Sequence, residues 1–315
     1  MQTILGAGGV MATELAKSLL EYTTDIRLVS RNPEKVNAND QLVCADLLDA
    51  QSVDKAVKGS SIVYVTIGFP YSAKVWQATW PKFIRHVVSA CKKYDAKLVF
   101  FDNIYMYDEE YLDGMTEETP ENPPSTKGKI RMEVNQIIRK EMESGGLSAL
   151  IARCADYYGP GITRNGMLRE LVLDNLANGK KANWLGSDNY KHSFTYTPDA
   201  GKATAILGNT SDAYGQVWHL PTAPNPYTGK EWITKIAHEM GKKPNYRVVP
   251  KFMVKIIGLF VPVMREIVEM MYQYDRNYVF DSSKFEKRFN FVPTSYDEGI
   301  RVIIARDYSS DQKVN

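Results

Sequence analysis

Cysteine is scarce in this chain, with only three among 315 residues, namely Cys44, Cys91 and Cys154. They lie far apart and form no CxxC pair. An odd, sparse set argues against a disulfide framework and is typical of proteins kept in a reducing compartment. We therefore expect a cytoplasmic protein.

The sequence also lacks histidines spaced as metal ligands. His238-Glu239 opens like an HExxH motif, but Lys242 stands where the second histidine would be. A zinc pair on one helix face needs both histidines. We expect no metal site.

The chain has neither an excess of one charge nor a long apolar run. Its 39 Lys and Arg against 37 Asp and Glu give a net charge of +2, which provides no general attraction for nucleic acid or an anionic membrane. The most apolar stretch, Ile256–Met264, is broken by Gly258 and Pro262 and is too short to span a bilayer, which needs about 20 residues. These features predict a soluble protein with no nucleic-acid and no membrane partner. The small-molecule substrate that we expect rests on the motifs described below.

The first half of the chain alternates short apolar runs with helical patterns. Runs without in-and-out alternation are typical of strands covered on both faces. Strand–helix alternation at this spacing predicts an α/β fold with a Rossmann-type, doubly wound parallel sheet. The expected strands are Thr3–Leu5, Ile26–Val29, Gln41–Cys44, Ile62–Thr66, Lys97–Phe101 and Ala149–Arg153, and the expected helices are Met11–Tyr22, Ser52–Val57, Val75–Tyr94 and Lys129–Glu143.

The pattern changes after Pro160, where glycine and proline become frequent. Two isolated pieces, Phe194–Thr197 and Val217–Leu220, are apolar enough to return to the first sheet. We predict a Rossmann domain over residues 1–158, joined by residues 194–221, and a smaller discontinuous α+β substrate lobe over residues 159–193 and 222–315.

A glycine-rich segment follows the first expected strand. Gly6, Gly8 and Gly9 permit a tight turn and a close approach of backbone N–H groups to a pyrophosphate, and the helix N-terminus adds partial positive charge. Tight turns need glycine for other reasons as well, so the position between Leu5 and the helix beginning near Met11 carries the argument. The segment predicts a dinucleotide site.

The second expected strand is followed by Ser30-Arg31, about 20 residues beyond the glycine-rich loop. An acidic residue at this place suits the ribose 2′-hydroxyl of NAD, whereas an arginine suits the 2′-phosphate of NADP. We therefore predict NADP, with NAD less favoured. The alternative is that Arg31 is an ordinary surface cation on a loop.

Further motifs follow in order along the chain. They are Gly6-xx-Gly9-xx-Ala12, Asp46-Leu47-Leu48-Asp49, Arg153 to Pro160 (RCADYYGP) and the C-terminal segment from Phe289 to Arg301. Together they resemble the extended short-chain dehydrogenases/reductases, on the side of the NAD-dependent epimerase/dehydratase-like members. The resemblance implies that the cofactor is held by Gly6, Ala7, Gly9, Val10, Arg31, Asp46, Leu47, Thr66, Ile67, Gly68 and Lys129.

The catalytic motif of that family is altered. Its members carry a Ser or Thr after the fifth strand and then YxxxK with a Glu four residues on. Lys129 and Glu133 fit this spacing, but Ser125 stands at the tyrosine position and Asn103 at that of the hydroxyl residue. Because a serine is too weak an acid for that role at neutral pH, we predict that Ser125 is a helix N-cap. The pattern is similar to the atypical subgroups of the family.

A replacement acid is predicted in the segment after the fifth strand. If this segment stays extended, Asn103, Tyr105 and Tyr107 share one face by the two-residue period. In this hypothesis Tyr105 replaces the missing phenol, Asn103 binds substrate, and Lys129 binds the cofactor and tunes the pKa of Tyr105. The alternative is that both tyrosines are half-buried packing aromatics.

Asp156 stands where nucleotide-sugar members of the family place an Asn for the substrate pyrophosphate. A carboxylate there would repel a pyrophosphate by a few kcal/mol, and that disfavours a sugar nucleotide. Tyr107, Asp156 and Tyr157 are the candidate substrate residues.

We predict an NADP-dependent oxidoreductase or epimerase-like enzyme of the atypical short-chain dehydrogenase type, acting on a small non-nucleotide carbonyl or alcohol. The alternatives are a non-catalytic NADP-binding sensor or regulatory protein, and a sugar-nucleotide epimerase or dehydratase with displaced catalytic residues. The resemblance also implies a homodimer through Val75–Tyr94 and Lys129–Glu143.

Overall fold

The computed structural model describes residues 1–164 and 166–309. These residues form two compact units, each assembled from separate segments of the chain. Unit 1 comprises Met1–Met106, Ser125–Cys154 and Pro198–Leu220, and unit 2 comprises Tyr107–Pro124, Ala155–Thr197 and the chain from Pro221 onward. The domain bounds expected from the sequence stay a prediction.

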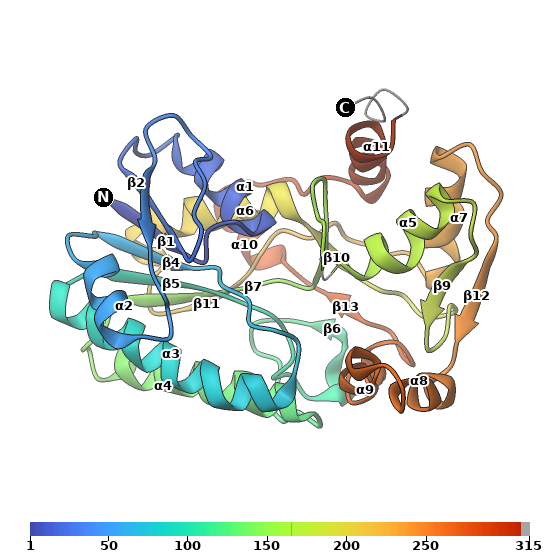
Figure 1. Ribbon diagram of the computed structural model, residues 1–315, viewed down its shortest axis with the longest axis horizontal. Helices are drawn as coiled ribbons and strands as arrows, with labels where there is room; N and C mark the ends of the chain where they lie inside the picture. Colours follow the sequence, from blue (N-terminus) through green and yellow to red (C-terminus); the bar gives the residue numbers. More distant parts are fainter. Residues whose placement is uncertain (165, 310–315) are drawn as a thin grey trace. The chain divides into compact units, whose positions relative to one another are not determined.

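Unit 1 is built on a seven-stranded sheet in the order β11-β7-β5-β4-β1-β2-β3 (Figure 1). Every neighbouring pair of strands is parallel. The chain runs outward from β1 in one direction and then from β4 in the other, so the predicted Rossmann-type doubly wound sheet is confirmed. The strands are β1 (Gln2–Leu5), β2 (Ile26–Ser30), β3 (Gln41–Cys44), β4 (Ile62–Val65), β5 (Lys97–Asp102), β7 (Ala149–Arg153) and β11 (Val217–His219).

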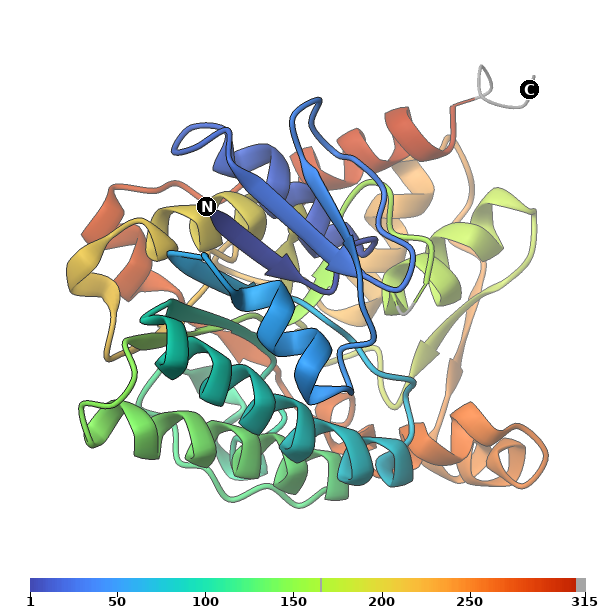
Figure 2. The same ribbon diagram turned by 60° about the vertical axis from the view of Figure 1, so that its left-hand side comes forward.

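Helices cover both faces of this sheet (Figures 1 and 2). One face carries α2, α3 and α4, because each of them turns an apolar stripe inward; in α4 the stripe includes Ile130, Val134 and Ile138 at helical spacing. The other face carries α1 and α6. The helices of unit 1 are α1 (Val10–Leu19), α2 (Ala50–Val57), α3 (Ala73–Tyr94), α4 (Thr126–Glu143), α6 (Thr197–Gly208) and the 3₁₀ turn Ser211–Ala213.

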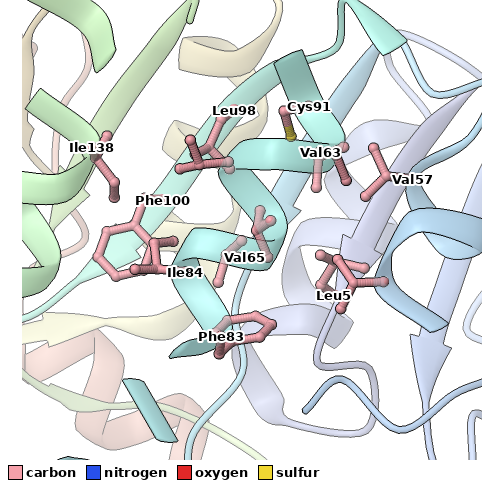
Figure 3. Close-up of a cluster of buried hydrophobic side chains, with 14 of the residues drawn as sticks. Leu5, Val57, Val63, Val65, Phe83, Ile84, Cys91, Leu98, Phe100 and Ile138 are labelled. Atoms are coloured by element: carbon pink, nitrogen blue, oxygen red, sulfur yellow. The ribbon is translucent and has the colours of Figure 1, made fainter. Parts of the chain in front are cut away.

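The core of unit 1 lies between the sheet and α2, α3 and α4 (Figure 3). Leu5 and Val65 are the last residues of β1 and β4, and Phe100 lies two residues before the end of β5. All three are almost completely buried. Full burial of one such side chain contributes about 1.5–3 kcal/mol. The strand ends that precede the candidate site are therefore firmly anchored.

Unit 2 contains three short parallel strand pairs. They are β8 (Asp156–Tyr158) with β10 (Phe194–Tyr196), β9 (Ala182–Leu185) with β12 (Tyr246–Val249), and β6 (Asp113–Met115) with β13 (Val279–Phe280). An aromatic cluster packs around Trp232, whose ring centroid lies 4.8 Å from that of Tyr296 and 5.1 Å from that of Phe194. Its helices are α5 (Asp174–Ala177), α7 (Gly229–Glu239), α8 (Lys251–Gly258), α9 (Pro262–Val268), α10 (Ser283–Phe289) and α11 (Tyr296–Asp307), with the 3₁₀ turns Glu109–Tyr111 and Met271–Gln273 and the π-helical segment Leu168–Leu173.

The two strand-like pieces in the second half of the chain have different partners. Val217–His219 forms the edge strand β11 of the seven-stranded sheet, whereas Phe194–Tyr196 forms β10 and pairs with β8. Within the described part of the chain, no helix has both the length and the apolarity needed to cross a bilayer.

Candidate functional site

The carboxyl ends of the parallel strands of unit 1 meet at one edge of the sheet. Gly6 follows β1, Arg31 follows β2, Asp46 comes shortly after β3, Thr66 follows β4 and Asn103 follows β5. Doubly wound sheets bind ligands at this edge, where the strand order reverses. In this chain the reversal lies between β1 and β4. The fold therefore brings residues from five separate loops to the place where a dinucleotide would bind.

Gly6 makes the bend at this reversal point. Its φ of +109° lies in the region that favours glycine, and a Cβ at this position would lie 2.4 Å from the backbone nitrogen of Ile67. The Gly6 N–H donates to the carbonyl oxygen of Val29 at 2.9 Å. Gly9 is extended and α1 begins at Val10, so the first-turn N–H groups of α1 are directed toward this bend.

Arg31 is exposed directly after the end of β2. Its carbonyl oxygen accepts a hydrogen bond from the Cys44 thiol at 2.9 Å, which holds the backbone of Arg31 beside β3. Asp46 is also exposed, and its carboxylate accepts from the Leu48 N–H at 3.0 Å. Leu47 is 4% exposed and belongs to the core. Arg31 is thus exposed at the carboxyl edge of the sheet.

The loop after β4 lines the same edge. The Thr66 N–H donates to the carbonyl oxygen of Leu5 at 2.9 Å, which continues the β1–β4 pairing by one residue. Thr66 and Ile67 are half-buried, and Gly68 is exposed. The backbone of this loop therefore lies directly beside the Gly6 bend.

The segment after β5 differs from its prediction. The strand ends at Asp102, and residues 103–107 form a turn in which the Tyr105 N–H donates to Asn103 Oδ1 at 3.1 Å. The predicted shared face of Asn103, Tyr105 and Tyr107 is therefore wrong, because the Asn103 side chain closes an Asx turn in place of an extended strand. The half-buried Tyr105 ring is stacked on Trp76, with centroids 6.1 Å apart and 15° between the rings. Tyr107 is fully buried and belongs to unit 2.

The start of α4 carries the altered catalytic motif. The buried Ser125 is the N-cap, and its hydroxyl oxygen accepts from the Gly128 N–H at 3.0 Å, so the predicted capping role is confirmed. Lys129 is exposed. Lys127 is fully buried, and its Nζ lies 4.7 Å from the centroid of the Tyr71 ring.

Sequence reasoning missed Lys127. The signal that could have found it is helical spacing, because Lys127, Arg131, Val134 and Ile138 follow one another at four- and three-residue steps along the buried face of α4. Lys129 lies off that face. Its motif partner Glu133 forms a surface ion pair with Arg85 at 3.3 Å.

A buried polar network ties α4 to two strands of unit 1. Asp102 at the end of β5 accepts from Arg131 Nε at 2.8 Å and from Asn135 Nδ2 at 2.7 Å. Asn135 Oδ1 accepts from Arg153 Nη2 of β7 at 2.8 Å. Since all four side chains are almost completely buried, loss of one charge would leave another without its partner at a cost of about 3–5 kcal/mol. The network holds the start of the β5 turn in place.

Unit 2 brings together a second polar group around Asp156. Asp156 Oδ2 lies 3.0 Å from Nε2 of His192 and accepts from the Tyr274 hydroxyl at 3.1 Å. The His192 ring is stacked between Tyr278, at 4.2 Å between centroids, and Tyr274, at 5.0 Å. His192 is 2% exposed. The Asp156 carboxylate is therefore held by two partners.

The sequence pattern does not indicate His192 as a site residue. Asp156 and His192 are far apart in the chain, and they meet because β8 and β10 pair with Phe194 opposite Asp156. The spacing of residues along the sequence does not predict a contact of this kind. Tyr157, the remaining candidate of this lobe, is half-buried.

Metal-ligating side chains do not cluster in the described residues, where no group of three His, Cys, Asp or Glu side chains is placed to hold an ion.

The fold and the glycine bend together define a Rossmann-type α/β protein. Residues 3–219 of the chain match the model of the NAD dependent epimerase/dehydratase family, and the chain belongs to that family. An uncharacterized protein of Sinorhizobium fredii (strain NBRC 101917 / NGR234), y4nG, is 24% identical over 211 residues, which cover 65% of this chain. The chain spans about half (52%) of the length of that relative.

Two solved structures illustrate the likeness in fold. MoeE5 in complex with UDP-glucose and NAD is 16% identical, with a TM-score of 0.79 over 96% of this chain and 97% of that one. The UDP-glucose 4-epimerase of Thermus thermophilus in complex with NAD is 17% identical, with a TM-score of 0.77 over 97% of this chain and 98% of that one.

Proposed function

We propose that the chain binds a nicotinamide dinucleotide at the carboxyl edge of the unit 1 sheet. The observation that carries this proposal is the Gly6 bend, where a Cβ would meet the backbone of Ile67 and where α1 begins. Gly6, Gly9 and the first turn of α1 would hold the pyrophosphate, and the bound nicotinamide would accept or donate a hydride. Family membership supports the same cofactor class.

Within this proposal the cofactor is NADP rather than NAD. The NAD complexes among the similar structures belong to those proteins, and the preference rests on Arg31 in this chain. Arg31 is exposed at the end of β2, where a forked guanidinium can pair with a 2′-phosphate.

We expect NADPH to bind roughly 10-fold or more tightly than NADH, because a hydrogen bond to a charged group contributes about 1.5–3 kcal/mol. Fluorescence titration of the full chain measures both affinities. Arg31→Ala should abolish the difference. Lys35→Ala is the matched control, since it removes an exposed cation from the same loop and should keep the preference. Equal affinities in the unaltered chain would exclude the role of Arg31.

The reaction we propose is an epimerase- or dehydratase-type oxidation and reduction of a sugar nucleotide, with displaced catalytic residues. The sequence argument against this substrate rests on the negative charge of Asp156. The Asp156 carboxylate accepts from the Tyr274 hydroxyl and lies 3.0 Å from His192 Nε2, so it is engaged in contacts within unit 2. Two proteins of similar fold support the same substrate class. MoeE5 was solved with UDP-glucose, and the other is a dTDP-glucose 4,6-dehydratase from Streptomyces venezuelae. Incubation with UDP- and dTDP-sugars beside a panel of simple carbonyls and alcohols, read by mass spectrometry, separates the two classes.

A second candidate function is a non-catalytic NADP-binding sensor. The observation in its favour is that Ser125 at the usual tyrosine position is used as a helix cap. Cofactor binding without turnover of any panel member would support the sensor.

We also propose a cytoplasmic location and a homodimer through α3 and α4. Analytical ultracentrifugation tests the homodimer.

A further inference from the structure

Helices α8 and α9 of unit 2 form a hairpin that exposes an unusual amount of apolar surface. Single exposed apolar side chains are common, but a contiguous run of large ones marks an interaction site. The exposed fractions along the hairpin are 63% for Phe252, 54% for Ile256, 78% for Leu259, 82% for Phe260, 40% for Val261 and 47% for Val263. We call these six residues the hairpin patch.

The hairpin patch lies on the outward face of α8 and α9 and does not belong to the core. The opposite face already packs inward, where the buried Val254 and the half-buried Ile257 lie against Val249 and Met271. Gly258 lets the two helices approach closely, because a Cβ there would lie 3.0 Å from the Cα of Arg265. The hairpin is therefore a packed element of unit 2 with an outward apolar surface.

The charged side chains between positions 251 and 265 are all cations. Lys251, Lys255 and Arg265 are exposed, and no carboxylate occurs between positions 251 and 265. The first acid that follows, Glu266, is half-buried. Large apolar side chains beside basic ones complement an anionic lipid interface, where the apolar groups enter the acyl boundary and the lysines reach the phosphates.

We propose that the hairpin patch docks this chain onto the surface of a membrane that contains anionic phospholipids. Leu259 and Phe260, at the turn between the helices, enter the interface, and Lys251 and Lys255 face the lipid phosphates. The docking is peripheral, since α8 and α9 have only 8 and 7 residues. A second copy of the chain fits the patch less well, because a two-fold contact would bring the same cations together.

This inference differs from the expectation of no membrane partner. The near-neutral net charge averages over all 315 residues, but charges in solution act over a Debye length of about 8 Å at physiological salt. A local group of cations without carboxylates therefore attracts an anionic surface even when the chain as a whole is close to neutral.

Sedimentation with vesicles tests the proposal on the full chain. We expect binding to vesicles of phosphatidylcholine mixed with phosphatidylglycerol, and at least 10-fold weaker binding to phosphatidylcholine alone. Leu259→Asp combined with Phe260→Asp should reduce binding at least 10-fold. Lys251→Glu combined with Lys255→Glu should reduce it by a similar factor, and added salt should weaken binding by the unaltered chain. Val292→Asp is the matched control, because Val292 is 86% exposed in unit 2 outside the hairpin, and it should bind normally.

Thermal unfolding checks that each variant is folded. Neither vesicle binding nor thermal unfolding depends on the cofactor or substrate proposals. Failure of the unaltered chain to bind anionic vesicles at low salt would overturn the docking proposal. Equal loss of binding in Val292→Asp would also overturn it. If the chain ignores vesicles but forms a dimer that Leu259→Asp and Phe260→Asp convert to a monomer, a second copy covers the patch and the membrane proposal is wrong.

Discussion

Ser125 and Tyr105 have different surroundings in unit 1, although both bear a hydroxyl group near the altered catalytic motif. The Ser125 hydroxyl is buried and accepts from the Gly128 N–H. Tyr105 is half-buried and lies on Trp76, in a turn after β5. A capping hydroxyl contributes to helix stability. Our hypothesis for Tyr105 is that its phenol exchanges a proton with substrate.

Substitution of each residue should therefore affect a different property. Ser125→Ala should lower the free energy of unfolding by about 1 kcal/mol and leave turnover unchanged, while Ser125→Gly, a tolerated N-cap, should cost only a few tenths. Tyr105→Phe should keep stability and reduce turnover roughly 10²- to 10⁴-fold. Urea unfolding and turnover of the sugar-nucleotide panel measure the two effects. Full turnover by Tyr105→Phe would remove Tyr105 from the mechanism.

The bend between β1 and α1 is the element on which the cofactor proposal rests. Gly6 has a positive φ and no room for a Cβ beside Ile67. Gly59, between α2 and β4, has a φ of +79° and open space around its Cα. An alanine at Gly59 would therefore introduce backbone strain alone, whereas an alanine at Gly6 would add a steric conflict with Ile67.

We expect Gly6→Ala to lower the free energy of unfolding by about 1–3 kcal/mol and to weaken NADPH binding at least 10-fold, because the bend must shift away from Ile67. Gly59→Ala should cost about 1 kcal/mol through strain alone and keep full affinity. Urea unfolding and NADPH fluorescence give both values. Unchanged NADPH affinity in a folded Gly6→Ala variant would contradict the proposed pyrophosphate site.

Elements with a strong local pattern were predicted well. The strands Gln41–Cys44 and Ala149–Arg153 have the expected bounds, and α3 begins only two residues before its prediction. In unit 2, the segment Leu168–Leu173 has π-helical hydrogen bonding and continues as the regular α-helix α5. A hydrophobic period cannot distinguish these two hydrogen-bond patterns over so few turns.

Buried ionisable groups in unit 1 link the stability of the chain to pH. Burial raises the pKa of the Cys91 thiol to about 12 and raises the pKa of Tyr64 well above its usual value. Because the folded chain keeps protons that the unfolded chain releases, this stability is fully present below the unfolded pKa of the thiol, about 8.5, and is lost as pH rises toward 12.

Urea midpoints across this range should show the effect. Above pH ~8.5 we expect Cys91 alone to cost about 1.4 kcal/mol of unfolding free energy per pH unit, with a further loss from Tyr64 above pH ~10. Cys91→Ala should flatten the first part of this decline, whereas Cys44→Ala, at an exposed position, should leave it unchanged. A decline as steep in Cys91→Ala as in the unaltered chain would rule out the thiol as its source.

The candidate site was predictable where its residues follow strands of a regular sheet. Once β1 to β4 are expected to be parallel, the loops that begin at Gly6, Arg31 and Thr66 must share one edge. Lys127 was missed because the motif spacing pointed to Lys129, and the direction of a side chain depends on how α4 sits on the sheet. The turn at Asn103 was missed because a short polar side chain can replace a strand hydrogen bond locally.

Local patterns of apolar, glycine and charged residues were therefore enough to predict the Rossmann sheet, most of its helices and the glycine bend, since neighbours along the chain carry that information. The pairing of Asp156 with His192 between two tyrosine rings, the burial of Lys127 and the exposure of the hairpin patch emerged from the folded chain alone. These features depend on contacts between segments far apart in sequence and on which helix face the rest of a unit covers. Neither can be read from the order of the amino acids, because both arise only when the chain folds.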